Sequence, residues 1–134
     1  MKLMKKVVSL VLLVMLLIPS FAMGEGSLTV FNWEDYIDES VIALFEQETG
    51  IHVNYMNFTT NEDMMVKVET SPGAFDIVFP SEYMVERMLA KDLLAEINYD
   101  NVPNAQYTLP NLLNPSYDPN GAHSIPYMWG TVGI

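Results

Sequence analysis

Cysteine is absent from this chain of 134 residues, and basic residues are scarce, with 6 Lys and Arg against 17 Asp and Glu and a net charge of −11. Without cysteine there is no disulfide framework, no thiolate nucleophile and no zinc or iron–sulfur site built on thiolates. The shortage of Lys and Arg argues against nucleic-acid binding, because these side chains neutralise the phosphate backbone. The composition favours a small cationic partner instead.

The chain begins with the three-part layout of a secretory signal. Three lysines precede a mostly apolar run of twelve residues, 7–18, and a proline–serine step separates this run from the small residues Ala22 and Gly24. A helix of that length spans about 18 Å, which is short of the roughly 30 Å hydrocarbon core of a bilayer. We therefore expect residues 1–24 to direct export, with cleavage after Ala22 or Gly24. An uncleaved leader that anchors the protein to a membrane is the alternative.

Export would increase the acidic imbalance. All seventeen acidic residues follow the leader, but only three basic residues do, so the exported part would carry a net charge of −14. Most of this charge suits a solvated surface that keeps an exported protein soluble. It also suits a site for a small cation, provided that the fold brings carboxylates and aromatic rings together.

Short apolar segments alternate with helical patterns from Ser27 onward. Strands are predicted over residues 28–31, 51–55 and 75–79, and helices between Asp38 and Gly50, over residues 61–70, and from Ser81 to about Ala90. This order implies right-handed crossovers and a mainly parallel sheet flanked by helices on both faces, which is an α/β fold. The turn signal at residues 118–121 predicts one further strand after it.

Two predicted loops lie beyond the carboxyl ends of the strands, where parallel sheets bind their ligands. They are residues 32–36 and 80–83, and their chemically useful side chains are Trp33, Asp35, Tyr36, Ser81 and Tyr83. An aromatic face attracts an ammonium group by about 0.5–2 kcal/mol, and a carboxylate adds a charge-assisted hydrogen bond. Together these side chains suit a primary amine on an alkyl chain. The alternative for each ring is ordinary packing in the core or at its rim.

Four segments in a fixed order resemble a known family. They are FNWEDY at residues 31–36, FEQETGI at 45–51, FDIVFPS at 75–81 and SIPYMWG at 124–130. They are similar to segments of the spermidine/putrescine-binding proteins of bacterial ABC importers, and the similarity extends from Leu28 to Ile134. The second segment occurs in many solute-binding proteins. The Trp-x-acid-Tyr loop combined with Pro-Ser-x-Tyr is more specific for polyamine receptors.

The resemblance implies a periplasmic receptor of the type II binding-protein fold, whose two lobes close over a polyamine and deliver it to a membrane permease. It implies a binding function without enzymatic activity, and we expect no cofactor and no metal. Family members are much longer, and their first lobe is built from two stretches of chain. We therefore expect residues 25–134 to form the first segment of the N-terminal lobe, with the second lobe absent from this sequence.

The resemblance also implies roles for individual residues. Trp33 and Tyr36 would enclose the methylene chain of the ligand, and Asp35 would meet an amino group. Ser81 and Tyr83 would complete this lobe's side of the cleft. Glu34 would be either an added cation contact or a solvated side chain. The acid at Asp35 is the residue type that resembles putrescine receptors, whereas Tyr83 resembles spermidine receptors. The resemblance therefore leaves the choice between putrescine and spermidine open.

Three other functions are weighed against this one. The same scaffold could hold another small cation. A serine hydrolase would need Ser81, Asp76 and His123 to meet, but no Gly-x-Ser-x-Gly elbow surrounds the serine. An uncleaved leader would favour a membrane-anchored interaction protein. The two histidines, at positions 52 and 123, lack the spacing of metal ligands.

Overall fold

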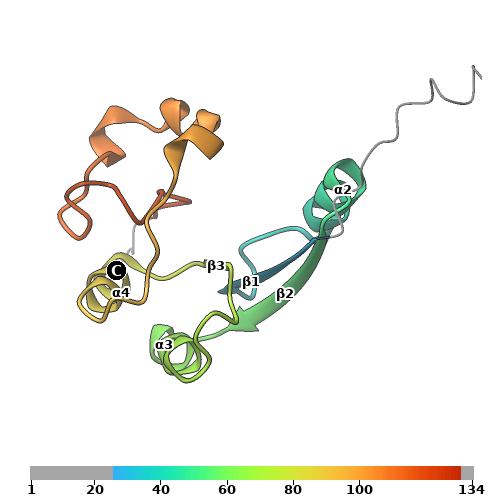
Figure 1. Cartoon of the computed structure of the whole chain (residues 1–134), viewed down its shortest axis with the longest axis horizontal. Coiled ribbons are helices and arrows are strands. Elements are labelled where there is room, and N and C mark those ends of the chain that lie inside the picture. The colour runs from blue at the N-terminus through green and yellow to red at the C-terminus, as the bar shows by residue number, and fades with distance from the viewer. Residues whose placement is uncertain (1–25, 131–134) are drawn as a thin grey trace, which may run out of the picture.

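The architecture is a parallel three-stranded sheet with helices on its faces, seen in a computed structural model that describes residues 26–130. The predicted leader and residues 131–134 lie outside the described residues. The strand order is β2-β1-β3, and both neighbours run parallel to the central strand (Figure 1). The strands are β1 (Ser27–Trp33), β2 (His52–Phe58) and β3 (Ile77–Val78). The predicted α/β class is confirmed.

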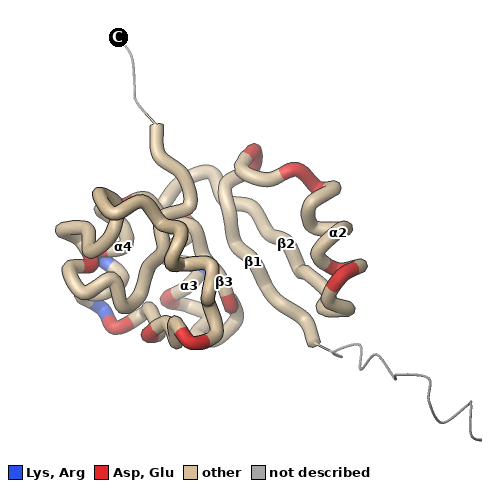
Figure 2. The backbone as a smooth tube through the Cα atoms, turned by 90° about the horizontal axis from the view of Figure 1, so that it is seen from above, with Lys and Arg blue, Asp and Glu red and all other residues tan. Residues whose placement is uncertain are grey.

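The helices follow the strands as the sequence pattern predicts. They are α2 (Glu39–Thr49), α3 (Asn61–Thr70) and α4 (Glu82–Leu89). The chain moves from β1 to β2 on one side and then back past β1 to β3. Right-handed crossovers therefore place α2 and α3 on opposite faces of the sheet (Figures 1 and 2).

The ends of α2 confirm two local predictions. The carboxylate of Asp38 accepts a hydrogen bond from the Ser40 N–H at 2.8 Å, and hydrogen bonding by the hydroxyl and N–H of Ser40 lowers the pKa of the Asp38 carboxyl. Gly50 ends the helix with a left-handed φ of 71°, a conformation that glycine adopts without steric cost. Both signals are local, and both act where the sequence places them.

The core lies between the sheet and the helices α3 and α4. Phe31 is 1% exposed, stacks on Phe75 with ring centroids 4.7 Å apart and meets Phe58 edge-on at 5.0 Å. Methionines from both helices fill the space around these rings, because the flexible thioether side chain adapts to irregular gaps in a core. The buried members are Met64, Met65, Met84 and Met88. This core fixes the two helices against the central strand.

Two strand predictions differ from the structure. β1 continues to Trp33, so the predicted loop over residues 32–36 is wrong at its first two positions, which pair with Asn57 and Phe58. β3 is shorter than the predicted strand over 75–79, although the N–H groups of Asp76 and Phe79 still donate to the carbonyls of Thr29 and Phe31, at 3.0 and 3.1 Å. The carboxylate of Asp76 also accepts a hydrogen bond from the Thr29 N–H at 2.8 Å.

The part of the chain after α4 contains three short 3₁₀ helices, η1 (Tyr99–Asn101), η2 (Pro103–Tyr107) and η3 (Pro110–Leu112). The predicted turn at residues 118–121 is present, with the Gly121 N–H bonded to the Asp118 carbonyl at 2.8 Å. The strand predicted after it is wrong for residues 122–130, which contain no strand. None of the helices in residues 26–130 has the length and apolar character needed to cross a membrane.

Candidate functional site

Trp33 joins the two predicted loops at the carboxyl end of the sheet. Its indole Nε1 donates a hydrogen bond to the Phe79 carbonyl at 2.9 Å, which connects the end of β1 to the residue that follows β3. The ring packs on Phe58 with centroids 4.5 Å apart. The side chain is half-buried. The indole therefore connects the two strand ends from which residues 34–36 and 80–83 continue.

The turn after Trp33 presents a second ring and two carboxylates. The centroids of the Trp33 and Tyr36 rings are 5.9 Å apart, and Tyr36 is 40% exposed. Glu34 and Asp35 lie in the turn between these rings, and both are exposed. An ammonium group can therefore approach either carboxylate from solvent while its alkyl chain lies against aromatic surface.

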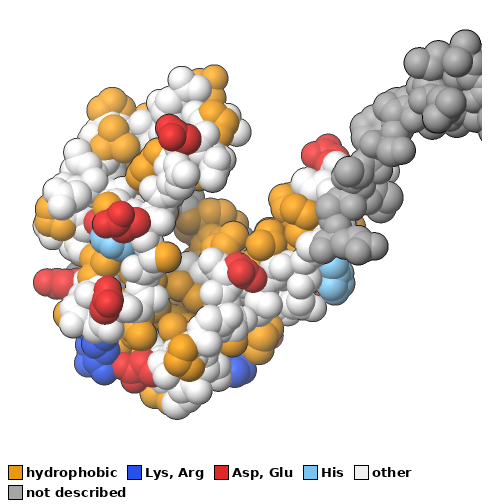
Figure 3. Space-filling model, in the orientation of Figure 1, with side chains coloured by type: hydrophobic (Ala, Val, Ile, Leu, Met, Phe, Trp, Pro, Cys, Tyr) orange, Lys and Arg blue, Asp and Glu red, His pale blue; other side chains and the backbone are white. Residues whose placement is uncertain are grey.

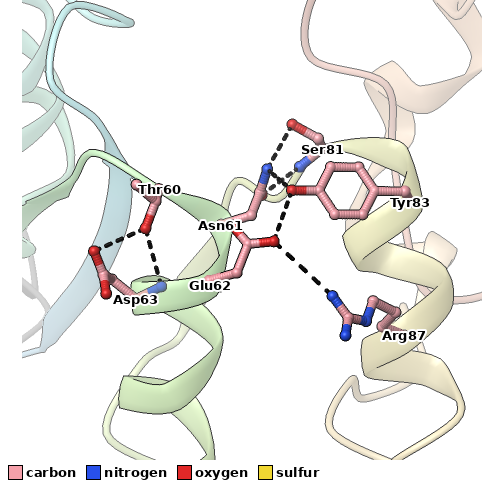
Figure 4. A network of polar contacts seen from close by, with 7 residues as sticks. All are labelled: Thr60, Asn61, Glu62, Asp63, Ser81, Tyr83 and Arg87. Atoms are coloured by element: carbon pink, nitrogen blue, oxygen red, sulfur yellow. Dashed lines mark hydrogen bonds and ion pairs between the residues drawn. The ribbon is translucent and has the colours of Figure 1, made fainter.

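Ser81 and Tyr83 are held together by Asn61, the first residue of α3 (Figure 4). The Asn61 Nδ2 donates to the Ser81 hydroxyl and to the Tyr83 hydroxyl, both at 3.0 Å, and its Oδ1 accepts from the Ser81 N–H at 3.0 Å. The Tyr83 hydroxyl donates in turn to Glu62 at 3.2 Å. Ser81 occupies the N-cap position of α4, at the predicted start of this helix, but its side chain makes no capping hydrogen bond.

Asn61 is placed by the start of its own helix. The Thr60 hydroxyl accepts a hydrogen bond from the Asp63 N–H at 3.1 Å and donates to the Asp63 carboxylate at 2.7 Å (Figure 4). This reciprocal cap starts α3 directly after β2, at the same sheet edge as Trp33. Sequence reasoning missed Asn61. The only signal was a polar residue in the first turn of a predicted helix at that edge.

Tyr127 brings a third segment to the site. Its hydroxyl donates to the Tyr36 carbonyl at 2.6 Å, and its ring meets Phe79 edge-on with centroids 4.7 Å apart. The segment 124–130 was part of the sequence resemblance but had no role assigned to it. In the space-filling view, hydrophobic side chains gather in the hollow between the segment after α4 and the α2 end of the molecule (Figure 3).

Charge is distributed unevenly around the sheet. Acidic residues occur at the turn after β1 and on all three α-helices, whereas the basic residues Lys67, Arg87 and Lys91 lie only on α3, on α4 and just after α4 (Figure 2). The turn after β1 and α2 therefore contain acidic residues and no Lys or Arg. Arg87 and Glu62 form an exposed ion pair at 3.9 Å, which contributes little because water screens both charges. The Trp33–Tyr36 turn thus carries negative charge.

The residues weighed for a hydrolase have separate partners. The Ser81 hydroxyl bonds to Asn61, the carboxylate of Asp76 accepts from Thr29, and the His123 imidazole lies 3.7 Å from Asp118. These residues make no hydrogen bond with one another within the part of the chain that the structure describes. In the same part, no group of three or more His, Cys, Asp or Glu residues is placed to hold a metal ion.

The sequence has curated relatives among bacterial transport proteins, although no family model matches it. The spermidine/putrescine-binding periplasmic protein of Escherichia coli is 36% identical over 110 residues, which cover 81% of this chain and 32% of that protein. The putrescine-binding periplasmic protein PotF of Escherichia coli is 35% identical over 117 residues, which cover 86% and 32%. The chain thus spans about a third of the length of the curated relatives it matches.

Solved structures agree with the sequence relatives. A spermidine/putrescine ABC transporter protein from Listeria monocytogenes is 43% identical, with a TM-score of 0.76 over 78% of this chain and 33% of that one. The substrate-binding protein PotD of Streptococcus pneumoniae is 41% identical, with a TM-score of 0.76 over 78% and 32%. These findings confirm the predicted resemblance and the predicted fold class.

Proposed function

We propose that this chain, which is homologous to spermidine/putrescine-binding proteins over about a third of their length, is a binding component of an ABC importer outside the cytoplasm. It captures a polyamine and delivers it to a membrane permease, without catalysis. The observation that carries this proposal is the bond from the Trp33 indole to the Phe79 carbonyl, because it joins the end of β1, before Asp35 and Tyr36, to the residue that precedes the 80–83 loop.

Each site residue has a role that its surroundings allow. The rings of Trp33 and Tyr36 pack on the methylene chain, and Asp35 accepts hydrogen bonds from the ammonium group, with Glu34 as a second exposed carboxylate. The Ser81 hydroxyl accepts one hydrogen bond from Asn61 and has a second lone pair for an ammonium donor. Tyr83 offers its partly exposed ring, because its hydroxyl already bonds to Asn61 and Glu62.

The affinity of these rings and carboxylates for a polyamine follows from the free energies of a few contacts. Two ring contacts contribute about 0.5–2 kcal/mol each, and one charge-assisted hydrogen bond contributes about 1.5–3 kcal/mol. A gross total of about 4 kcal/mol corresponds to a dissociation constant on the order of 1 mM, and the entropy lost on association makes this the tightest binding expected. We therefore expect weak but saturable binding by the chain itself.

A fluorescence titration tests this proposal. The sequence has two tryptophans, so a Trp129→Phe variant leaves Trp33 as the only one. Putrescine and spermidine are each expected to change its emission along a saturable curve in the millimolar range. The ligand with the lower midpoint is the preferred one. Magnesium chloride at matched ionic strength, which has charge but no methylene chain, is expected to leave the emission nearly unchanged. An equal response to magnesium, or no response to either polyamine in the folded protein, would contradict the proposal.

A further inference from the structure

The pairing register places polar side chains of β1 and β2 on the face opposite the Trp33 ring. Val30 pairs with Tyr55, Asn32 with Asn57, and Trp33 with Phe58. Because side chains alternate along a strand, Asn32, Tyr55 and Asn57 lie on one face of the sheet. The Trp33 ring lies on the other face, against Phe58.

These three polar side chains contact the backbone of Trp33 from the face of the sheet opposite its ring. The Trp33 N–H donates to the Asn32 Oδ1 at 2.8 Å. The Trp33 carbonyl accepts from the Asn57 Nδ2 at 3.3 Å and from the Tyr55 hydroxyl at 3.5 Å. Trp33 is the last residue of β1 and pairs with the last residue of β2, so the ladder ends here. Its carbonyl also accepts from the Tyr36 N–H at 3.5 Å, and the three side chains supply the other partners of its backbone.

The burial of Asn32 indicates that this arrangement has a cost. Its side chain is 0% exposed, and its Nδ2 has no hydrogen-bond partner among residues 26–130. An apolar side chain at this position would avoid burying that donor, but it would leave the Trp33 N–H without its acceptor. Burial raises the pKa of the neighbouring Tyr55 hydroxyl above its ordinary value of 10.0, against the opposing effect of the Asn32 side chain, and the phenol is a hydrogen-bond donor at neutral pH with or without this shift.

We propose that Asn32, Tyr55 and Asn57, here named the peptide bracket, fix the position of the Trp33 indole and thereby set the affinity of the polyamine site. The affinity part rests on the proposed function. The bracket holds the peptide of Trp33 from one face of the sheet, and the Phe79 carbonyl holds the indole Nε1 on the other. The ring is therefore fixed at both ends, and the three bracket residues act as positioning residues through Trp33.

The test uses variants of the Trp129→Phe chain, in which Trp33 is the only tryptophan. Tyr55→Phe removes one hydroxyl, and Asn57→Ala removes one exposed amide. The double variant removes both side-chain donors to the Trp33 carbonyl and leaves only the Tyr36 N–H, at 3.5 Å, among the donors described here. Asn54→Ala is the matched control, because Asn54 is an exposed asparagine of the same strand on the opposite face. Acrylamide quenching reports how accessible the indole is, and polyamine titration reports affinity.

The double variant is expected to raise the quenching constant of Trp33 about twofold and to weaken polyamine binding about three- to tenfold, with smaller changes in the single variants. Asn54→Ala is expected to leave both values unchanged. Thermal unfolding of each variant tests whether the fold persists. Tyr55→Phe loses a single oxygen atom, so its quenching constant and affinity can be measured even if Asn57→Ala lowers stability. Equal quenching in the double variant and the Asn54→Ala control would overturn the bracket.

Failure of the bracket and failure of the proposed function give different results. If polyamines bind and the double variant changes neither quenching nor affinity, the bracket is wrong and the proposed function stands. If no polyamine binds and the double variant still raises quenching, the bracket holds Trp33 but the assigned ligand is wrong.

Discussion

Replacing Trp33 by alanine is expected to weaken polyamine binding by at least about tenfold. The dissociation constant of the variant would then exceed the millimolar concentrations of the titration. The change removes one of the two rings that flank the exposed carboxylates, and it removes the bond between the indole and Phe79. Both the packing surface for the methylene chain and the connection between the two loops are lost. Broadening of the putrescine methylene signals in ligand-observed NMR measures the effect without a label.

The controls for this prediction use the same residue type. Trp129 is 78% exposed, and Trp129→Ala is expected to leave the broadening within about twofold of the parent chain. Trp33→Phe keeps a ring on Phe58 but has no Nε1 donor, so an intermediate effect is expected. Backbone amide spectra establish that each variant is folded. Equal losses for Trp33→Ala and Trp129→Ala would place the ligand elsewhere.

Replacing Asp118 by alanine is expected to lower the free energy of unfolding by about 2–4 kcal/mol. Asp118 is 2% exposed, and its carboxylate accepts hydrogen bonds from the N–H groups of Ala122, His123 and Ser124 and from the Ser124 hydroxyl, at 2.8–3.2 Å. Without the carboxylate, three backbone donors lose their acceptor and the loop that leads to Tyr127 loses its anchor. Urea denaturation measures the change.

The same carboxylate predicts a dependence of stability on pH. Burial raises the pKa of Asp118, but the hydrogen bonds from His123, Ser124 and Ala122 together outweigh burial and hold the pKa below its ordinary value of 3.8. A group with a lowered pKa stabilises the fold above its unfolded value and loses that contribution as the pH falls through the folded pKa. We therefore expect stability to decline below about pH 4, and this part of the decline to be absent in Asp118→Asn.

Asp100→Asn is the matched control for Asp118. Asp100 is exposed in η1, and its carboxylate makes no hydrogen bond with the other described residues. Its replacement is expected to leave both the stability at neutral pH and the acid profile within experimental error of the parent chain. Identical acid profiles for Asp118→Asn and the parent would show that other carboxylates cause the decline.

The sequence predicted the features whose signals are local. Asp38 and Gly50 mark the ends of α2, and Thr70 ends α3 where the pattern expects it, because caps and stop signals act through neighbouring residues. The three strand–helix alternations predicted the parallel sheet, since the pattern leaves few alternatives for the crossovers. The position of the loops after β1 and β3 at one edge followed from the parallel sheet alone, because the carboxyl ends of parallel strands lie at the same edge.

The features that the sequence did not predict depend on contacts between distant segments. Asn61 is an ordinary first residue of a helix until the fold places Ser81 and Tyr83 within reach of its amide. Asn32 has the character of a loop residue, yet it is buried at the end of the central strand. Asp118 belongs to a turn signal, and nothing local indicates that its carboxylate binds the N–H groups of the residues that follow, where a strand was predicted.

The central claim is that one polyamine site lies at the carboxyl edge of the sheet, and an NMR titration of the ¹⁵N-labelled chain with putrescine tests it most directly. The claim predicts that the Trp33 indole N–H and the amides of Asp35, Tyr36 and Ser81 shift together along one saturable curve. It also predicts that Gly26 and His52, at the amino end of the sheet, stay in place. Small shifts spread over the acidic surface without saturation, with the Trp33 indole unmoved, would contradict the claim.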